Sequence, residues 1–197
     1  MKKWVLIGAG VVVLLGVVTW AYIDATKPLP GTKINDEGRG HVPIGEKVEY
    51  HSNPPTSGKH YEAWTKKGVY DEPQDDRNLV HSLEHGYIIL SYNCDWVQGT
   101  GNRVQGTVEA SGSASPSAQL SDKFKSVDCQ QLVEKLKGIY EKEGKTKLIV
   151  VPRPNLDIQI ALTAWDYLDK LNEVDESKIR TFIKQHFNKG PELTMEP

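Results

Sequence analysis

The sequence has little cysteine, no large excess of charge of either sign, and none of several widespread catalytic signatures. Its 197 residues include two cysteines, and the net charge is −2. A near-neutral chain without a cluster of basic residues argues against nucleic-acid binding, which requires a basic face. There is no Walker pattern and no G-x-S-x-G elbow, so neither a nucleotide-binding P-loop nor a hydrolase serine is expected. No internal repeat is present.

One long apolar run stands at the N-terminus. Trp4–Ile23 contains no charged residue, and its 20 residues match a hydrocarbon core of about 30 Å. Lys2 and Lys3 favour a cytoplasmic N-terminus and an extracytoplasmic position for the rest. The alternative is a cleaved signal peptide, but no A-x-A site follows the run. A lipoprotein is not expected, because no cysteine lies near the run. We expect residues 1–23 to anchor a single-pass protein in the cell membrane.

The rest of the chain divides by composition. Residues 24–40 are rich in proline, glycine and charge, which predicts a linker. Residues 41–192 are expected to form one extracytoplasmic domain, large enough to bury its own core, followed by a tail over 193–197. Within this domain, residues 99–119 are rich in glycine and serine and poor in apolar residues, which predicts a flexible surface insertion.

Cys94 and Cys129 flank the predicted insertion. Two cysteines in an oxidising compartment usually pair, and a bridge closing a loop of about 36 residues contributes on the order of 4 kcal/mol in the chain-entropy model. The alternative is two free buried thiols. The predicted anchor favours the disulfide.

Hydrophobic periodicity predicts an α+β domain with a small, mainly antiparallel sheet and two or three packed helices. The expected strands are 87–92, 146–151 and 157–165. The expected helices are 80–85 closed by Gly86, 128–144 capped by Asp128 and Gln131, and a last helix from Asp175 or Ser177 to Gly190. A short strand over 47–51 and a helical turn within 57–64 are alternatives to irregular structure.

Four of the six histidines lie close together in the sequence: His51, His60, His81 and His85. His81 and His85 are four residues apart, so both project from one face of a helix. Neutral imidazoles with this spacing bind zinc or copper. We expect His60 as the third ligand, with His51 as the second candidate. Glu84 is a fourth ligand or a residue that orients the others.

Other interpretations of these histidines stay open. His-x-x-x-His pairs on exposed helices are often only solvated. HSLEH also matches the H-x-x-E-H motif of inverted zinc peptidases, in which Glu84 would be the general base of a hydrolase. Gly86 and a strand follow at once, and the domain is small for that class, so an enzyme is not the favoured interpretation. A non-metal binding or structural module with a buried histidine network is the third possibility. His41 and His186 are assigned to the linker boundary and to an amphipathic helix.

Five motifs together resemble a bacterial family, the domain of unknown function DUF3105. In chain order they are PPTSGKHY, GVY, VHSLEHGYIILSY, ALTAW and FIKQHFNKGPE. The resemblance extends from about His41 to Glu192 and implies an N-terminal membrane segment, but no activity. It places the family motif on Pro55, Ser57, Gly58, His60, His81, Glu84, His85, Gly86 and Trp165. The segment 99–119 is an insertion relative to the family pattern. Three histidines and a glutamate within the motif favour a specific metal site.

Overall fold

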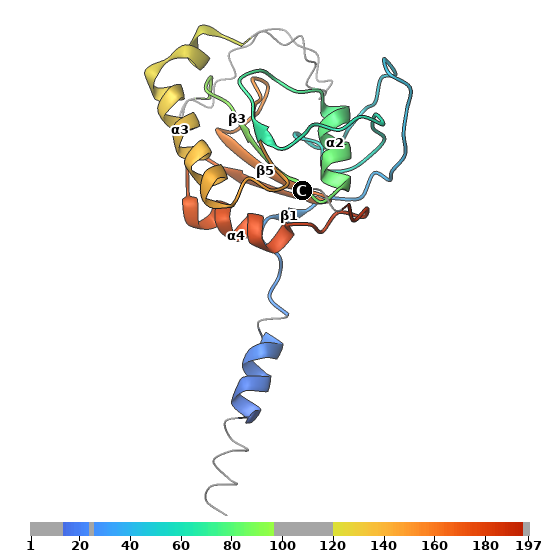
Figure 1. Cartoon of the computed structure of the whole chain (residues 1–197), viewed down its shortest axis with the longest axis vertical. Coiled ribbons are helices and arrows are strands. Elements are labelled where there is room, and N and C mark those ends of the chain that lie inside the picture. Colours follow the sequence, from blue (N-terminus) through green and yellow to red (C-terminus); the bar gives the residue numbers. More distant parts are fainter. Residues whose placement is uncertain (1–13, 24–25, 97–119, 195–197) are drawn as a thin grey trace, which may run out of the picture.

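Six strands form one mixed sheet in the computed structural model, which describes residues 14–23, 26–96 and 120–194 (Figure 1). The strands are β1 (Thr32–Lys33), β2 (Gly68–Val69), β3 (Ile88–Tyr92), β4 (Leu148–Pro152), β5 (Ile160–Ala164) and β6 (Tyr167–Leu171). Their order in the sheet is β1-β6-β5-β3-β4-β2. The predicted α+β class is confirmed.

Most strand pairs are antiparallel, as predicted, but the sheet is mixed. β1, β6, β5 and β3 pair antiparallel, whereas β4 runs parallel to both β3 and β2. Parallel neighbours need a long crossover, and the connection from β3 to β4 supplies one that contains helix α3 (Val127–Lys142). The sequence prediction missed this pairing because strand direction depends on the connection and not on the strand's own residues.

The two faces of the sheet carry different helices. Alternate residues of a strand point to opposite faces, so Ile88 and Leu90 of β3 belong to the core under α3 and α4 (Glu176–His186). Ile89 belongs to a smaller core under α2 (Asp76–Glu84). Figure 1 shows α3 and α2 on opposite sides of the strands. The apolar stripe of α3 follows the helical period, and its four members are buried: Leu132, Leu136, Ile139 and Tyr140.

Helix boundaries follow local capping chemistry. Asp175 caps α4 as predicted, with its side chain accepting from Lys178 N at 3.0 Å. Ser126 caps α3, so the prediction of Asp128 is wrong by two positions. Helix α2 begins earlier than predicted, because Asp75 accepts from Arg77 N at 2.9 Å and so satisfies a donor of its first turn. Gly86, at φ 79°, follows the end of α2 in the left-handed conformation, as expected.

Several weaker expectations fail. Residues 47–51 contain no strand and residues 57–64 contain no helical turn. The fifth strand is shorter than the predicted 157–165, and α4 ends at His186 rather than near Gly190. β1 lies inside the predicted linker, where Thr32 pairs with Leu168 of β6. Edge strands this short leave no periodicity to detect.

The predicted disulfide is confirmed. Cys94 follows β3, Cys129 lies in the first turn of α3, and their Cα atoms are 5.5 Å apart. The bridge ties α3 to the sheet on its larger apolar face. The predicted insertion, residues 99–119, lies outside the described residues.

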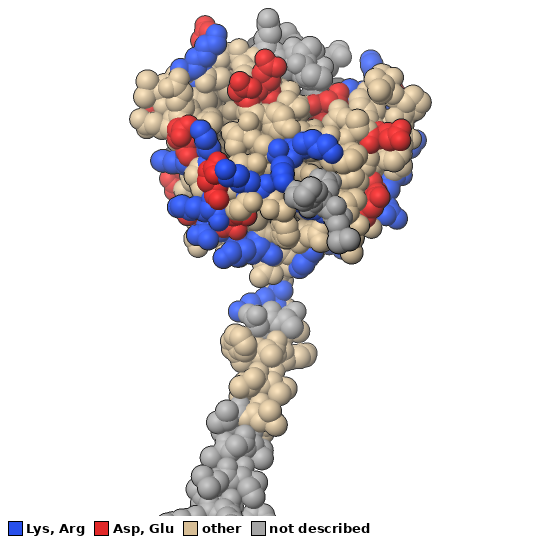
Figure 2. All heavy atoms as spheres, in the orientation of Figure 1, with Lys and Arg blue, Asp and Glu red and all other residues tan. Residues whose placement is uncertain are grey.

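The predicted anchor is described only in part. Residues 14–23 are helical, while residues 4–13 of the apolar run lie outside the described residues. Across the described ranges, the structure contains no helix of sufficient length and apolarity to span a bilayer. Figure 2 shows acidic and basic side chains interspersed over the visible face of the sheet domain.

Candidate metal centre

The end of α2 presents three potential ligands to one buried place. His81 and Glu84 lie in its last turn, and His85 is the residue that ends it. Their exposed fractions are 4%, 6% and 4%. The helix can bury this polar edge because Leu79 and Leu83 seat it on the sheet and a loop over residues 56–65 covers its other side. The Ser82 hydroxyl donates to Thr65 O at 2.7 Å, which fixes that loop against the helix.

The covering loop brings His60 to the helix. Its backbone is held by Tyr61 N, which donates to Arg77 O at 3.3 Å. The ring of His60 is fully buried, and its centroid lies 4.8 Å from that of His81. The structure therefore brings His60 together with the helical histidine pair.

His41 also belongs to the cluster, although the sequence assigned it to the linker boundary. Three backbone hydrogen bonds of 2.8 to 3.0 Å join residues 38–42 to residues 58–60, in a short parallel bridge. This pairing places the His41 ring 5.2 Å from His60 and 5.0 Å from His81. No periodicity in residues 36–42 predicts the bridge; the only signal was the histidine itself.

His51 lies elsewhere. Its side chain is 86% exposed, and its Nδ1 is 3.3 Å from Glu37 Oε2. It is in neither group of potential metal ligands that the described residues form. Of the two candidates for a third ligand, the structure brings only His60 to the pair.

Hydrogen bonds fix the tautomers of two of these rings. His60 Nδ1 lies 2.8 Å from Gly58 O, and His81 Nδ1 lies 2.7 Å from Tyr61 O. A carbonyl oxygen only accepts, so each Nδ1 carries the proton and each neutral ring keeps its lone pair on Nε2. Metal-binding histidines are oriented by the same kind of bond from their other nitrogen. Both Nε2 atoms therefore face the cluster as acceptors, and that of His81 accepts from His85 Nε2 at 3.0 Å.

The His60 ring faces the Glu84 carboxylate at close range. His60 Nε2 lies 2.9 Å from Glu84 Oε2, yet this buried nitrogen has no partner with hydrogen-bond geometry. If the ring carries a proton on Nδ1 alone, the two facing atoms both carry lone pairs, which repel at this distance. A second proton on Nε2 or a metal ion bound to both atoms removes that repulsion. A metal ion beside the pair satisfies both.

Burial keeps the central imidazole neutral. Desolvation lowers the pKa of His81 to about 4, with neighbouring His85, His60 and His41 lowering it further and the bond to Tyr61 opposing this. A histidine must be neutral to bind a metal, and His81 meets this condition at neutral pH.

Among the described residues, potential ligands fall into two overlapping groups, and within each group the ligand atoms lie within 4.8 Å of one another. The inner group contains His41, His60, His81 and Glu84; the outer group contains His81, His85 and Glu192. His81 joins them, and its Nε2 lies 3.0 Å from His85 Nε2. Nitrogen and carboxylate donors in this mixture suit zinc or copper better than calcium or magnesium, which prefer oxygen alone. Sequence reasoning missed His41 and Glu192, because both arrive from segments distant in the chain.

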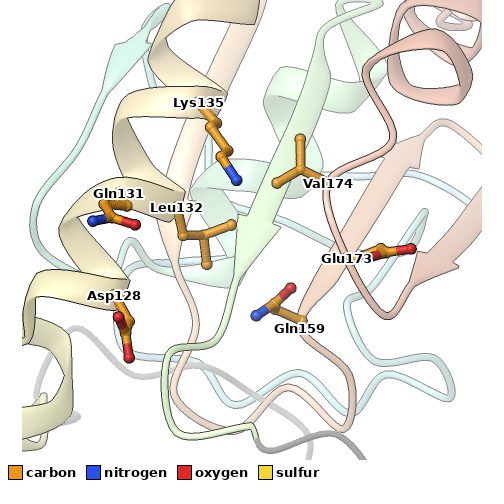
Figure 3. A pocket seen from close by; sticks show the side chains of 7 residues that line it. All are labelled: Asp128, Gln131, Leu132, Lys135, Gln159, Glu173 and Val174. Carbon is orange, nitrogen blue, oxygen red and sulfur yellow. The ribbon is translucent and has the colours of Figure 1, made fainter.

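A separate cavity of about 200 Å³ lies between α3 and the ends of β5 and β6 (Figure 3). It is lined by Asp128, Gln131, Leu132, Lys135, Gln159, Glu173 and Val174. These side chains contribute both signs of charge and no histidine or cysteine, so the cavity does not resemble the metal-ligand cluster.

Fold and site together define an α+β domain with a buried cluster of histidine and glutamate. The chain belongs to the family described as protein of unknown function (DUF3105), whose model matches residues 41–128 and 124–197. The resemblance drawn from the motifs is thereby confirmed. No curated protein and no solved structure matches the chain. A functional conclusion therefore rests on the geometry of the cluster.

Proposed function

We propose that this protein binds one transition-metal ion, zinc or copper, in the inner group of His41, His60, His81 and Glu84. The observation that carries the proposal is the buried contact between His60 Nε2 and Glu84 Oε2 at 2.9 Å without hydrogen-bond geometry. A polar atom buried without a partner costs about 1–3 kcal/mol. An ion bound to both atoms removes that cost, and His81 offers a third donor within 4.8 Å of them.

The arrangement favours binding over zinc-dependent hydrolysis. A general base must be free to take a proton from a water bound to the metal. Glu84 instead contacts His60, and its carboxylate is one of the groups that can bind the ion. Its other oxygen, Oε1, lies 4.0 Å from Arg39 Nε. Glu84 is therefore better placed as a ligand than as a base, and we do not propose an enzyme.

We propose further that Trp4–Ile23 anchors the chain in the cell membrane, with the sheet domain on the extracytoplasmic side. Support comes from the uncharged run after Lys2 and Lys3 and from the disulfide, which is typical of oxidising compartments. N-terminal sequencing of protein extracted from membranes should begin at the start of the chain. A start near Ala25 would contradict the anchor.

Elemental analysis tests the metal proposal directly. The full chain, purified in detergent with a tag that contains no histidine and loaded with zinc or copper, should retain about one ion after gel filtration. His60→Ala and His81→Ala should not retain it, because each removes a donor from the inner group. His51→Ala is the matched control and should bind like the wild type, since His51 lies outside the cluster. A wild-type chain that retains no ion, or variants that bind as well as the control, would refute the proposal.

A further inference from the structure

The C-terminal segment 187–194, which we name the strap, crosses the end of α2. Asn188 N donates to Gly86 O at 3.0 Å, and Glu192 N donates to Glu84 O at 3.0 Å. These bonds attach the strap to the same helix end that carries the metal-ligand cluster. The position of the strap is therefore coupled to the position of the ligands.

The close approach of the strap depends on glycine. A Cβ atom on Gly190 would lie 2.1 Å from Glu84 O and 2.4 Å from Gly86 N. Both are backbone atoms and cannot move aside, so any other residue at 190 would push the strap away from α2. The two backbone hydrogen bonds of the strap therefore require glycine at position 190.

A buried lysine forms hydrogen bonds with both the strap and the end of α2. Lys147 is 4% exposed, and its Nζ donates to His85 O at 2.7 Å, Asn188 Oδ1 at 2.6 Å and Thr194 O at 2.6 Å. The ammonium also sits where the carbonyl groups at the end of α2 concentrate negative potential. One side chain thus joins the helix end, the start of the strap and its last described residue.

The strap places Glu192 beside the cluster. Its Oε2 lies 3.8 Å from His85 Nε2, and its side chain is 55% exposed while that of His85 is 5% exposed. His81, His85 and Glu192 can all reach a common point. The inner group opens to solvent through His41, and this second group opens to solvent through Glu192.

We propose that His81, His85 and Glu192 form an outer position through which the metal ion enters and leaves the inner one. This proposal rests on the proposed function. His81 Nε2 has one lone pair and binds one ion at a time, so the two positions are occupied in turn. His85 Nε2 donates to His81 Nε2 at 3.0 Å, so an ion at the outer position would require the His85 proton to move from Nε2 to Nδ1. Bonds to His85 and Glu192 would then break as bonds to His60 and Glu84 form, while His81 stays bound and the His85 proton returns to Nε2. No electron is transferred and no residue is consumed.

Exchange kinetics of zinc in the full chain test the outer position. Glu192→Gln removes the carboxylate and keeps the backbone of the strap. It should slow zinc transfer to a chromophoric chelator by roughly tenfold, with a smaller change in equilibrium affinity, because the inner ligands remain. Glu173→Gln is the matched control: it loses the same charge at an exposed position outside both ligand groups. Equal rates in the two variants would overturn the proposal.

A second measurement isolates the outer position at equilibrium. His60→Ala removes an inner ligand, and the weak zinc binding that remains should fall by a further factor of roughly ten when Glu192→Gln is added. No further loss on that background would also overturn the proposal. If the wild type binds no zinc, the proposed function fails with it. If the wild type binds zinc and Glu192→Gln changes neither rate nor residual affinity, the outer position alone fails.

Discussion

The two faces of the sheet bury different kinds of side chain. Under α3 and α4 the core is almost entirely aliphatic and aromatic, and His186 is its one buried titratable histidine among the described residues. Under α2 the apolar core is smaller and adjoins a dense set of buried polar groups, among them His60, His81 and Glu84. Apolar burial is the dominant favourable term in folding, and buried polar groups are costly. We therefore assign most of the stability to the face under α3 and α4, and metal binding to the face under α2.

A buried ion pair supports the polar face. Arg153 Nη2 donates to Asp76 Oδ2 at 2.9 Å, and Arg153 Nε donates to Asn53 Oδ1 at 2.8 Å. These bonds connect the first turn of α2 to a sheet strand's end and to the loop that leads toward His60. Buried pairs of this kind contribute less than apolar packing would. Here they fix the position of α2 relative to the loop that carries His60.

The largest expected effect comes from matched cavities on the two faces. Leu136 in α3 and Leu83 in α2 are both fully buried, so Leu136→Ala and Leu83→Ala should each lower the free energy of unfolding by about 2–5 kcal/mol. Only Leu83→Ala should also weaken zinc binding, because Leu83 seats the helix that carries the ligands. Urea denaturation in chelator and zinc titration of the folded variants separate the two effects. Equal loss of zinc affinity in both variants would contradict the assignment of metal binding to the α2 face.

Loss of the disulfide should have an effect of similar size confined to stability. Replacing both Cys94 and Cys129 with alanine should lower the free energy of unfolding by about 4 kcal/mol in the chain-entropy model. Zinc affinity should not change, because the bridge lies on the α3 face. Thiol labelling of the unreduced, denatured wild type should find no free cysteine. Two labelled thiols, or a zinc affinity that falls with the bridge, would contradict this.

Metal-linked stability should distinguish the faces more finely. Zinc at 100 times its dissociation constant should stabilise the wild type by about 2.7 kcal/mol, since the ion binds only the folded state. His81→Ala should lose this increment, while His51→Ala should keep it. Thermal unfolding with and without zinc measures the difference. An increment that survives in His81→Ala would place the bound ion outside the cluster.

Sequence patterns predicted the parts of this molecule that depend on local chemistry. The stripe of α3 and the Asp175 cap each follow from residues within a few positions. The placement of His41 and Glu192 does not, because it depends on a parallel bridge and on a glycine contact between segments far apart in the chain. The parallel pairing of β4 was missed for the same reason, because no residue of β4 encodes its direction.

The smallest expected effect concerns His186, the histidine of the apolar face. Its Nε2 donates to Pro30 O at 2.8 Å, and its ring lies 4.4 Å from those of Tyr167 and Phe182. Burial lowers the pKa of His186, with Lys189 adding to the effect and the bond to Pro30 opposing it. The unfolded chain therefore binds this proton more readily than the folded one.

Stability contributed by the neutral ring of His186 is fully present above the unfolded pKa of about 6.5 and is lost as the pH falls toward the lower, folded pKa. The slope from one proton cannot exceed about 1.4 kcal/mol per pH unit. We expect the wild type to lose more unfolding free energy between about pH 7 and about pH 5 than His186→Gln, which does not titrate in this range. Urea denaturation of both proteins in chelator measures the difference, because the histidines of the metal-ligand cluster then titrate equally in each. Parallel pH profiles would show that folding does not lower the pKa of His186. The apolar face would then accept a protonated histidine, contrary to the contrast drawn between the two faces.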